Sequence, residues 1–360
     1  MYVRRLRNFD FILFLASLAL VAYGVVLIYS GSLPSYESTG AALSHPVTRQ
    51  IAFAVVGIVI MLLLTRTDYH LLGYGATGLY MAAMAALVFV LMVSSPVYGA
   101  RRWIEIAGTP VQPSEIAKLV LIIVMARYLT DRQEQIGQLK TFLASLGIAL
   151  VPIILVFAEP DLGSAVIFVA IWLAMIIIAG ARSRHILGLF ASFAVAMPFV
   201  LIGLINDYQR ERIATFLDPA KDPLGSGFNT LQAEIGIGSG GLFGKGLTHG
   251  TQTTDYIFSV LGEELGFVGA VVLFALFVLL LWRGLRTATS CPDPFGRLLA
   301  TGIVTFILFQ VFINIGVNIR LLPVTGIPLP FISQGGSSLI TLFIAMGILQ
   351  SIRVHQPARW

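Results

Sequence analysis

Charged residues are scarce in this sequence, and their scarcity argues against an ordinary water-soluble domain. Only 11% of the 360 residues are charged, whereas 57% are hydrophobic and the mean hydropathy is +0.88. Soluble domains carry about a quarter charged residues. The composition therefore indicates a membrane protein.

Cysteine and clustered histidine are also lacking. Cys291 is the single cysteine, so an intrachain disulfide is excluded. The five histidines are scattered without the spacing of metal ligands, which argues against a dedicated zinc site. Apolar and polar residues do not alternate with the period of a strand, which argues against a transmembrane barrel.

Long apolar runs dominate the sequence instead, each long enough to cross about 30 Å of hydrocarbon as a helix. The run that begins at Phe11 follows three arginines, as in a signal peptide, but no small-residue cleavage site and soluble segment come after it, so we expect a retained span. We predict an all-α polytopic membrane protein in which residues 1–360 form one domain. About ten transmembrane helices are expected, at residues 11–29, 47–64, 71–93, 114–129, 141–157, 163–179, 186–205, 257–282, 298–317 and 337–352.

The distribution of lysine and arginine predicts the orientation of these spans. Most of the cations fall on one side of the membrane if the N-terminus is cytoplasmic, and cytoplasmic loops are the ones enriched in Lys and Arg. Both termini are then predicted to be cytoplasmic. The net charge of +5 is explained by this topology signal, without nucleic acid as a partner.

Acidic residues and one long loop mark the outer side. Most Asp and Glu residues fall there, either as ordinary solvated loop residues or as part of a chemical site. Residues 206–256 form an outer loop between the seventh and eighth helices, and a loop of that length is usually functional or disordered. It joins a charged, partly amphipathic stretch to a glycine-rich one, so we expect it to fold against the membrane surface.

Asp255, just before the eighth span, is the first candidate for chemistry. Aspartate is a favoured helix N-cap, and capping is the simpler explanation for its place. A carboxylate at the rim of a helix bundle, within reach of water, could also accept a proton from a hydroxyl nucleophile.

Four other acids lie near predicted helix ends. Glu263 and Glu264 are two turns into the helix that follows Asp255, where a carboxylate is costly unless it faces a cavity or a partner. Around the helix axis Glu263 lies about 80° from Asp255 and Glu264 nearly opposite, so the two cannot line one cavity equally. Glu159 and Asp161 lie in a turn, and Asp161 is expected to cap the sixth helix.

Three cations lie at the same predicted end of the bundle. Arg101 and Arg102 open the loop after the third span, and Lys118 lies about one turn into the fourth. Glu115 and Lys118 are three residues apart, which predicts an ion pair on the helix surface. Alternatively, the three cations would suit an anionic headgroup such as a pyrophosphate.

Glycine and proline mark two irregular segments. Residues 236–241 match GxGxxG, but no strand precedes them, so a dinucleotide site is rejected and tight turns or close backbone approach are expected. Residues 322–338 carry three prolines and three glycines yet are apolar. Non-helical backbone at membrane depth must be buried in protein or line a wet cavity, so this segment is the strongest purely physical indication of a site. It contributes the candidates Pro330, Ser333, Gly335 and Gly336.

These motifs together resemble the shape, elongation, division and sporulation family of membrane proteins. The resemblance covers essentially the whole chain, in order. The short N-terminal arm favours the elongation branch over the division branch. The resemblance is carried by residues 99–104, 112–118, 159–165, 232–246, 254–258, 263–266 and 322–338.

The resemblance implies a peptidoglycan glycosyltransferase of the bacterial cytoplasmic membrane that works on the extracytoplasmic face during cell elongation. It would polymerise lipid II, a disaccharide-peptide on undecaprenyl pyrophosphate, into β-1,4-linked glycan. Asp255 matches the family's essential aspartate and would be the general base of an inverting single displacement. Arg101, Arg102 and Lys118, with a divalent cation such as Mg or Mn, would neutralise the leaving pyrophosphate. Further candidates for substrate binding are Trp103, Glu115, Arg210 and Lys245.

The resemblance also implies a partner, a class B penicillin-binding protein that cross-links the new strand. Two other functions compete with polymerisation. A lipid II flippase predicts ionisable residues at mid-membrane and inverted repeats, neither of which is clear in this sequence. A scaffold that only recruits the penicillin-binding protein predicts that Asp255 is dispensable.

Overall fold

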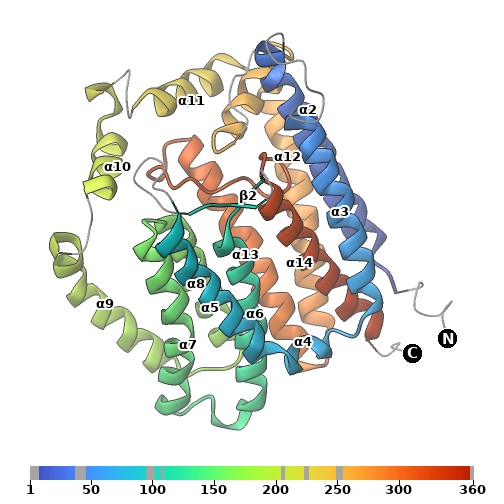
Figure 1. Cartoon of the computed structure of the whole chain (residues 1–360), viewed down its shortest axis with the longest axis vertical. Helices are drawn as coiled ribbons and strands as arrows, with labels where there is room; N and C mark the ends of the chain where they lie inside the picture. Colours follow the sequence, from blue (N-terminus) through green and yellow to red (C-terminus); the bar gives the residue numbers. More distant parts are fainter. Residues whose placement is uncertain are drawn as a thin grey trace.

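A computed structural model describes residues 8–36, 46–94, 102–106, 109–203, 207–222, 227–248 and 254–356. It confirms the all-α prediction, because helices account for most of the described chain (Figure 1). One short hairpin was not expected: β1 (Ile104–Ile106) pairs antiparallel with β2 (Thr109–Val111). Strands of three residues are too short for a periodic pattern to reveal them.

Each of the ten expected runs coincides with a helix. The third run differs in being interrupted: a short helix α4 (His70–Tyr74) ends at Gly75, and the membrane-length helix starts only after it. The helices are α2 (Phe11–Tyr36), α3 (Pro46–Arg66), α5 (Ala76–Val93), α6 (Pro113–Asp131), α7 (Leu139–Ala158), α8 (Leu162–Ile178), α9 (Ser183–Gly203), α12 (Ile257–Ser290), α13 (Pro294–Asn318) and α14 (Gly336–His355).

Seven helices in the described part of the chain are long and apolar enough to cross a membrane: α2, α3, α5, α7, α12, α13 and α14. The apolar helices α8 and α9 are shorter over their described residues. Helix α6 carries Glu115, Lys118 and Arg127, more ionisable residues than a simple span. Crossing by these three helices therefore stays a prediction, whereas a multi-pass membrane protein is supported.

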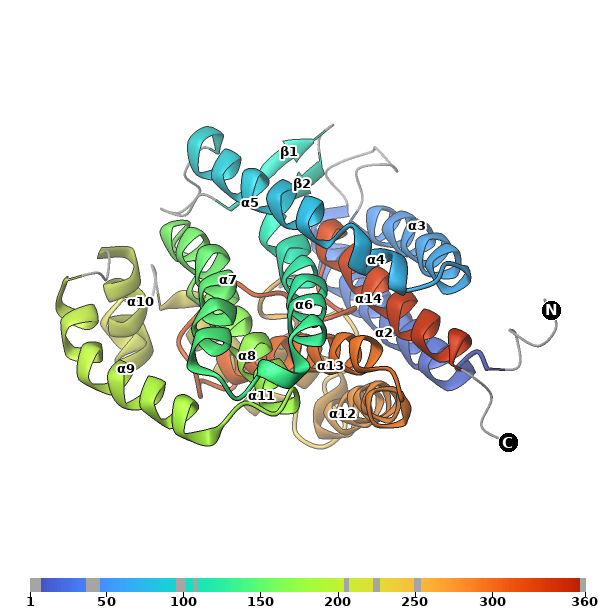
Figure 2. The same ribbon diagram turned by 90° about the horizontal axis from the view of Figure 1, so that it is seen from below.

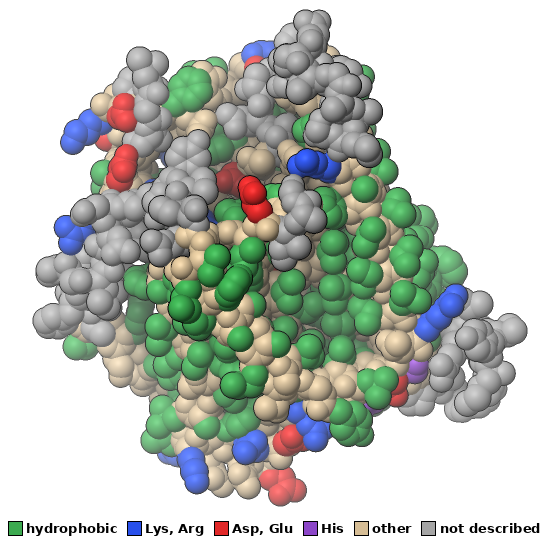
Figure 3. Space-filling model, in the orientation of Figure 1, with side chains coloured by type: hydrophobic (Ala, Val, Ile, Leu, Met, Phe, Trp, Pro, Cys, Tyr) green, Lys and Arg blue, Asp and Glu red, His purple; other side chains and the backbone are tan. Residues whose placement is uncertain are grey.

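The bundle is built around α13 and α14. Helix α13 packs against α12, α8 and α6, and α14 packs mainly against α3, as the view from below also shows (Figure 2). Both central helices are mostly buried, whereas α3 exposes Val55, Val59 and Leu63. On one face of the molecule apolar side chains form a broad belt with charged residues above and below it (Figure 3). Such a belt is the surface expected to face hydrocarbon.

The start of α2 and the end of α14 lie together at one end of the bundle. Asp10, which is almost fully buried, forms ion pairs with Arg283 (2.7 Å) and Arg353 (2.9 Å). Its main-chain N–H donates to Gln350 Oε1 at 2.9 Å. A buried carboxylate with two arginines and a main-chain bond ties α2, α12 and α14 together.

The long loop folds into its own helices at the opposite end of the bundle (Figure 1). It contains α10 (Asp207–Leu217), a single 3-10 turn (Pro219–Lys221) and α11 (Phe228–Ser239), which packs against α12. Its predicted placement on a membrane surface stays a prediction.

The glycine-rich part of this loop interrupts α12. At Gly266 the backbone leaves the helical conformation (φ +62°), and the loop supplies the missing hydrogen bonds. Phe267 N donates to Gly241 O at 2.9 Å, and Lys245 N donates to Glu263 O at 2.9 Å. The close backbone approach predicted for residues 236–241 is confirmed at Gly240, where a Cβ would lie 1.9 Å from the Gly262 carbonyl oxygen, and the same holds for Gly244, where it would lie 2.1 Å from the Glu264 carbonyl oxygen.

Residues 321–335, between α13 and α14, form no regular structure, as their prolines and glycines predicted. Buried side chains on α13 form hydrogen bonds with the carbonyl groups of this segment. Gln310 Nε2 donates to Pro328 O (3.2 Å), and Asn314 Nδ2 donates to Ile327 O (2.8 Å). Ser333 Oγ accepts from Leu329 N at 2.8 Å, and Pro330 is buried. The expectation that this segment is buried in protein or lines a cavity is confirmed as burial for most of residues 327–333, whereas residues 322–326 are only partly buried.

Candidate active site

Asp255 lies beside the broken segment and does not cap α12. The helix begins at Ile257 after the N-cap Tyr256, and the N–H of Ser259 is taken up by Asn318 Oδ1 at 3.1 Å. The capping interpretation of Asp255 is therefore wrong. Because a distant asparagine fills that role, the Asp255 side chain is available for other contacts.

Two buried asparagines on α13 fix Asp255 through its main chain. The Nδ2 groups of Asn314 and Asn318 both donate to the Asp255 carbonyl oxygen, each at 2.9 Å. Asn314 bonds Ile327 O as well, so one side chain joins Asp255 to the broken segment. The sequence reading missed both asparagines, although two buried amides one helical turn apart in an apolar helix are a signal of a shared backbone partner.

Two arginines and a second acid surround the Asp255 carboxyl group. Burial raises its pKa, the charges of Arg212 and Arg102 act to lower it, and Asp161 raises it further, with burial dominant. The Asp255 carboxyl and the Arg102 guanidinium both lie close to Gly326. A Cβ on that glycine would lie 3.0 Å from Arg102 Nη1 and 3.6 Å from Asp255 Oδ2. Gly326 has φ +75°, a conformation that glycine adopts without strain.

Arg102 connects three elements. It is 6% exposed, and Nη1 donates to Thr325 O at 3.1 Å while Nη2 donates to Pro160 O. Its Nη1 lies 3.8 Å from Asp161 Oδ1. Asp161 itself accepts from Ser164 N at 3.1 Å, so its predicted role as cap of α8 is confirmed.

Glu159, at the end of α7, is fully buried, and neither of its carboxyl oxygens has a hydrogen-bond partner among the described residues. Burial, reinforced by Asp161 and opposed by Arg102, raises its pKa to about 8. A carboxyl group without a partner in a dry site is stable in its neutral form. Glu159 therefore carries a proton at neutral pH.

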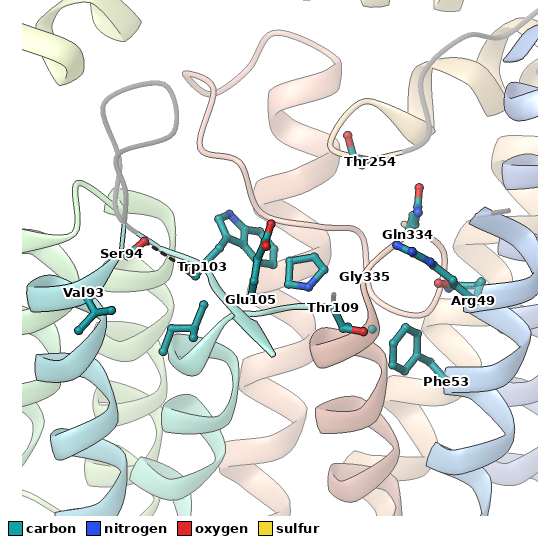
Figure 4. A pocket seen from close by; sticks show the side chains of 14 residues that line it. Arg49, Phe53, Val93, Ser94, Trp103, Glu105, Thr109, Thr254, Gln334 and Gly335 are labelled. Atoms are coloured by element: carbon teal, nitrogen blue, oxygen red, sulfur yellow. Dashed lines mark hydrogen bonds between the residues drawn. The ribbon is translucent and has the colours of Figure 1, made fainter. Parts of the chain in front are cut away.

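A cavity of about 760 Å³ is lined by Thr254, the residue before Asp255 (Figure 4). Trp103 and Glu105 of the hairpin region also contribute to its wall. Arg49 at the start of α3 and the end of the broken segment, including Gln334, Gly335 and Gly336, line it as well. The predicted cavity residues Trp103, Gly335 and Gly336 are thus brought together, and the mixed polar lining suits a sugar.

A second cavity of about 250 Å³ lies between α8, α10 and residues 322–325 of the broken segment. Its walls are apolar and include Leu162, Val166, Ile313 and Val324. Arg212 of α10 also lines it, and its Nη1 donates to Val324 O at 2.8 Å. Arg210 is the arginine of this loop that the sequence pattern suggested for substrate binding, but it is exposed. Arg212 lines the smaller cavity instead.

Lys118 and Lys245, two other predicted cations, line neither cavity. Lys118 is fully buried and pairs with Glu115 at 2.6 Å, which confirms the ion pair expected from their spacing, although buried rather than on the surface. No solvent reaches Lys118, so a ligand cannot contact it in this conformation. Lys245 pairs with Glu263 at 2.8 Å. Arg101 falls outside the described residues.

Glu263 and Glu264 do not line either cavity. Glu264 is fully buried and accepts from Ser30 Oγ at 2.6 Å and from Thr248 N at 3.1 Å, so it fastens the loop to α2. Within the described ranges no group of three His, Cys, Asp or Glu residues is arranged to hold a metal ion. The donor set around Asp255 therefore does not fit a metal site made by protein ligands alone.

Comparisons with known proteins agree with this geometry. The sequence model of the FtsW/RodA/SpoVE family, described as a cell cycle protein, matches residues 10–358. The chain is 37% identical over 358 residues to the peptidoglycan glycosyltransferase MrdB of Escherichia coli K12, which covers 97% of this chain and 94% of the relative. It is 37% identical over 354 residues to stage V sporulation protein E of Bacillus subtilis, covering 95% and 96%.

Two solved structures share the fold. One, from work on a peptidoglycan synthase complex that coordinates polymerisation and crosslinking, has a TM-score of 0.83 at 31% identity and covers 97% of this chain and 99% of that one. The rod shape determining protein RodA of Thermus thermophilus has a TM-score of 0.72 at 29% identity, covering 97% and 98%. The resemblance read from the motifs is confirmed over nearly the full length. The chain belongs to the FtsW/RodA/SpoVE family, the shape, elongation, division and sporulation proteins.

Proposed function

We propose that Asp255 is the general base with which this peptidoglycan glycosyltransferase polymerises lipid II. The activity follows from the relatives, of which MrdB at 37% identity over nearly the full length is named for it. The observation that carries the role of Asp255 is its setting: a half-buried carboxyl, relieved of helix capping and facing two arginines, next to a residue that lines the larger cavity.

In the proposed reaction Asp255 takes the proton of the acceptor GlcNAc 4-hydroxyl as that oxygen attacks the anomeric carbon of the donor MurNAc. The new glycosidic bond forms as the bond to pyrophosphate breaks, and the anomeric configuration inverts in this single displacement. Burial raises the pKa of Asp255, which makes its carboxylate a stronger proton acceptor than an exposed one. Protonated Asp255 returns its proton to water through the larger cavity.

The positive charge of Arg102 supports the proposed reaction at Asp255, because the leaving pyrophosphate develops negative charge. Arg102 is held rigidly by the carbonyl oxygens of Thr325 and Pro160, so its charge is fixed beside the reacting groups. Fixed charges stabilise a developing anion without having to reorient during the reaction. A divalent cation remains part of the proposal; it would arrive with the pyrophosphate of the substrate, since the described acids form no cage for it.

We further place the reaction on the extracytoplasmic side of the bacterial inner membrane and assign it to cell elongation, with a class B penicillin-binding protein as partner. The start of α12, which follows Asp255, lies at the opposite end of the bundle from the end of α14, whose Arg353 pairs with Asp10 (Figure 1). The lysine and arginine pattern assigns the latter end to the cytoplasm. The partner is suggested by the structural neighbour from a synthase complex that joins polymerisation to crosslinking.

The test uses the purified full chain with its partner, lipid II and a divalent cation, and compares wild type with Asp255→Ala. Wild type is expected to form glycan polymer, and the alanine variant is expected to lose at least about a hundredfold in rate, the usual contribution of a general base. Full polymerisation by Asp255→Ala would remove the catalytic assignment and favour a scaffold. Lipid II scrambling in liposomes without polymer would favour a flippase.

A further inference from the structure

The chemistry of the proposed reaction restricts where one pyrophosphate lies. The donor pyrophosphate is attached to the carbon under attack, so it must lie within about one sugar ring of the base. The acceptor pyrophosphate is separated from the reacting hydroxyl by a whole disaccharide. The smaller cavity is lined by Thr325, whose neighbour Gly326 lies beside the Asp255 carboxyl, so its position near the base points to the donor rather than to the acceptor.

The smaller cavity has the matching chemistry. Its walls are nearly all apolar, and Arg212 provides a guanidinium group at the cavity. The charge of Arg212 acts on Asp255, as does that of Arg102. Guanidinium groups bind phosphate oxygens through paired N–H donors, whereas an isoprenoid chain requires apolar walls.

The same cavity reaches the apolar exterior of the bundle. Val166 of α8 belongs to its wall and is 50% exposed, and Val169, one turn further along α8, is 44% exposed. A volume of about 250 Å³ holds only the first isoprene units of a long prenyl chain. The remainder would continue over the apolar face of α8 into the lipid.

We propose that the cavity between α8, α10 and residues 322–325 binds the pyrophosphate end of the donor lipid. Arg212 contacts the pyrophosphate, the charge of Arg102 acts from behind Thr325 and Pro160 in the cavity wall, and the first isoprene units lie against Val166, Leu162 and Ile313. This proposal rests on the proposed function, because it assumes that a prenyl pyrophosphate is the donor. It leaves the larger cavity, with Arg49, Glu105 and Gln334 in its wall, for the polar acceptor headgroup.

The test measures binding of geranylgeranyl pyrophosphate to the full-length chain in detergent. Arg212→Gln removes the charge and is expected to weaken binding about tenfold, the loss typical of a charge-assisted contact. Arg212→Lys keeps the charge without the fork and should bind with intermediate affinity. Val166→Phe fills the cavity from a half-exposed position and should also weaken binding by about tenfold, since a bulkier side chain excludes the isoprene units.

Matched controls lie outside the cavity. Lys221→Gln removes an exposed cation of the same loop, and Val278→Phe enlarges an exposed position of α12 that lines neither cavity. Both should bind the probe as wild type does. Inorganic pyrophosphate and geranylgeraniol, tested separately, should each bind more weakly than the intact lipid, because each carries only half of the recognised chemistry.

Wild-type affinity in both Arg212→Gln and Val166→Phe would overturn the proposal, and so would inorganic pyrophosphate binding as tightly as the prenyl pyrophosphate. Asp255→Ala separates the two claims, because it should bind the probe at least as tightly as wild type while failing to polymerise lipid II. Polymerisation by Asp255→Ala would instead contradict the proposed base.

Discussion

At the scale of single residues, short sequence motifs were enough to predict Asp255 and Arg102 as site residues. They did not reveal the asparagine side chains that hold Asp255 in place. Asp255 stood out because it precedes an apolar run, and a local pattern is visible in sequence. Its anchors, Asn314 and Asn318, are 59 and 63 residues away, so the contact appears only in the folded bundle. Choosing between Arg210 and Arg212 required the rotational setting of a short helix, which loop sequence does not determine.

The setting of Asp255 predicts how activity depends on pH. A general base must be deprotonated, so kcat/KM should fall as pH drops through a pKa that burial has raised above the ordinary aspartate value. Arg212→Gln removes the largest charge that lowers this pKa and should move the acidic limb to higher pH. The measurement is the pH profile of lipid II polymerisation, with Lys221→Gln as the control. An acidic limb in Arg212→Gln that is unmoved or lies at lower pH would contradict the account.

The buried carboxyl of Glu159 predicts a pH dependence of stability. Its pKa is raised from 4.5 to about 8, so between these values the folded state binds more protons than the unfolded state. The free energy of unfolding should therefore fall as pH rises over this range. Glu159→Gln imitates the protonated form at every pH, so it should match wild type near pH 4, below the unfolded pKa, and unfold at a higher temperature than wild type near pH 9.

Thermal unfolding in detergent at the two pH values tests this expectation. The rise in Tm at high pH should be roughly 2–4 °C for each kcal/mol that the buried charge costs. Glu263→Gln, a partly exposed partner of Lys245, is the control and should show no comparable gain. A Glu159→Gln variant that follows the wild-type pH dependence would show that Glu159 is not buried as a neutral acid.

At the scale of elements, the break in α12 shows what hydropathy alone does not reveal. The apolar run from residue 257 predicted one uninterrupted helix, whereas the structure contains a non-helical Gly266 matched to Gly241 and Gly244 of the loop. The glycines predicted close backbone packing but did not indicate that the packing partner is α12. The partner became visible only when the loop hydrogen bonds to residues on both sides of Gly266 were seen.

A pair of glycine variants tests this arrangement. Gly244 and Gly241 both have positive φ values, but a Cβ on Gly244 would overlap the Glu264 carbonyl oxygen, whereas a Cβ on Gly241 meets no atom within 4 Å. Gly241→Ala should cost about 1–2 kcal/mol from backbone strain alone. Gly244→Ala should cost roughly 1–3 kcal/mol more from the steric overlap. Equal losses of thermal stability in the two variants would contradict the described packing.

At the scale of the whole molecule, the number and order of helices could be predicted because apolar length is encoded locally. All ten runs became helices, with ends that moved by as many as eight residues where polar groups such as Arg283 continue a helix beyond its apolar part. The central position of α13 and α14 was not predictable, since every span is apolar and hydropathy does not rank them. Which helices enclose Asp255 followed only from their packing.

The predicted orientation is testable with single cysteines. Cys291 is buried, so the natural thiol gives little background labelling. Lys221→Cys lies in the loop assigned to the outside, and Gln135→Cys lies in the connection between α6 and α7 assigned to the cytoplasm; both positions are exposed. A membrane-impermeant maleimide applied to intact cells should label the first and spare the second. The reverse pattern would invert the topology and move Asp255 to the cytoplasmic side.

The most direct test of the central claim is lipid II polymerisation by Asp255→Asn. Asparagine preserves the shape of the side chain and leaves the main-chain bonds from Asn314 and Asn318 in place, so it removes only the proton acceptor. The account predicts a folded protein whose polymerisation rate is lower by about 10²–10⁴-fold, the contribution of a general base. Glycan strands formed by Asp255→Asn at the wild-type rate would show that another group takes the proton.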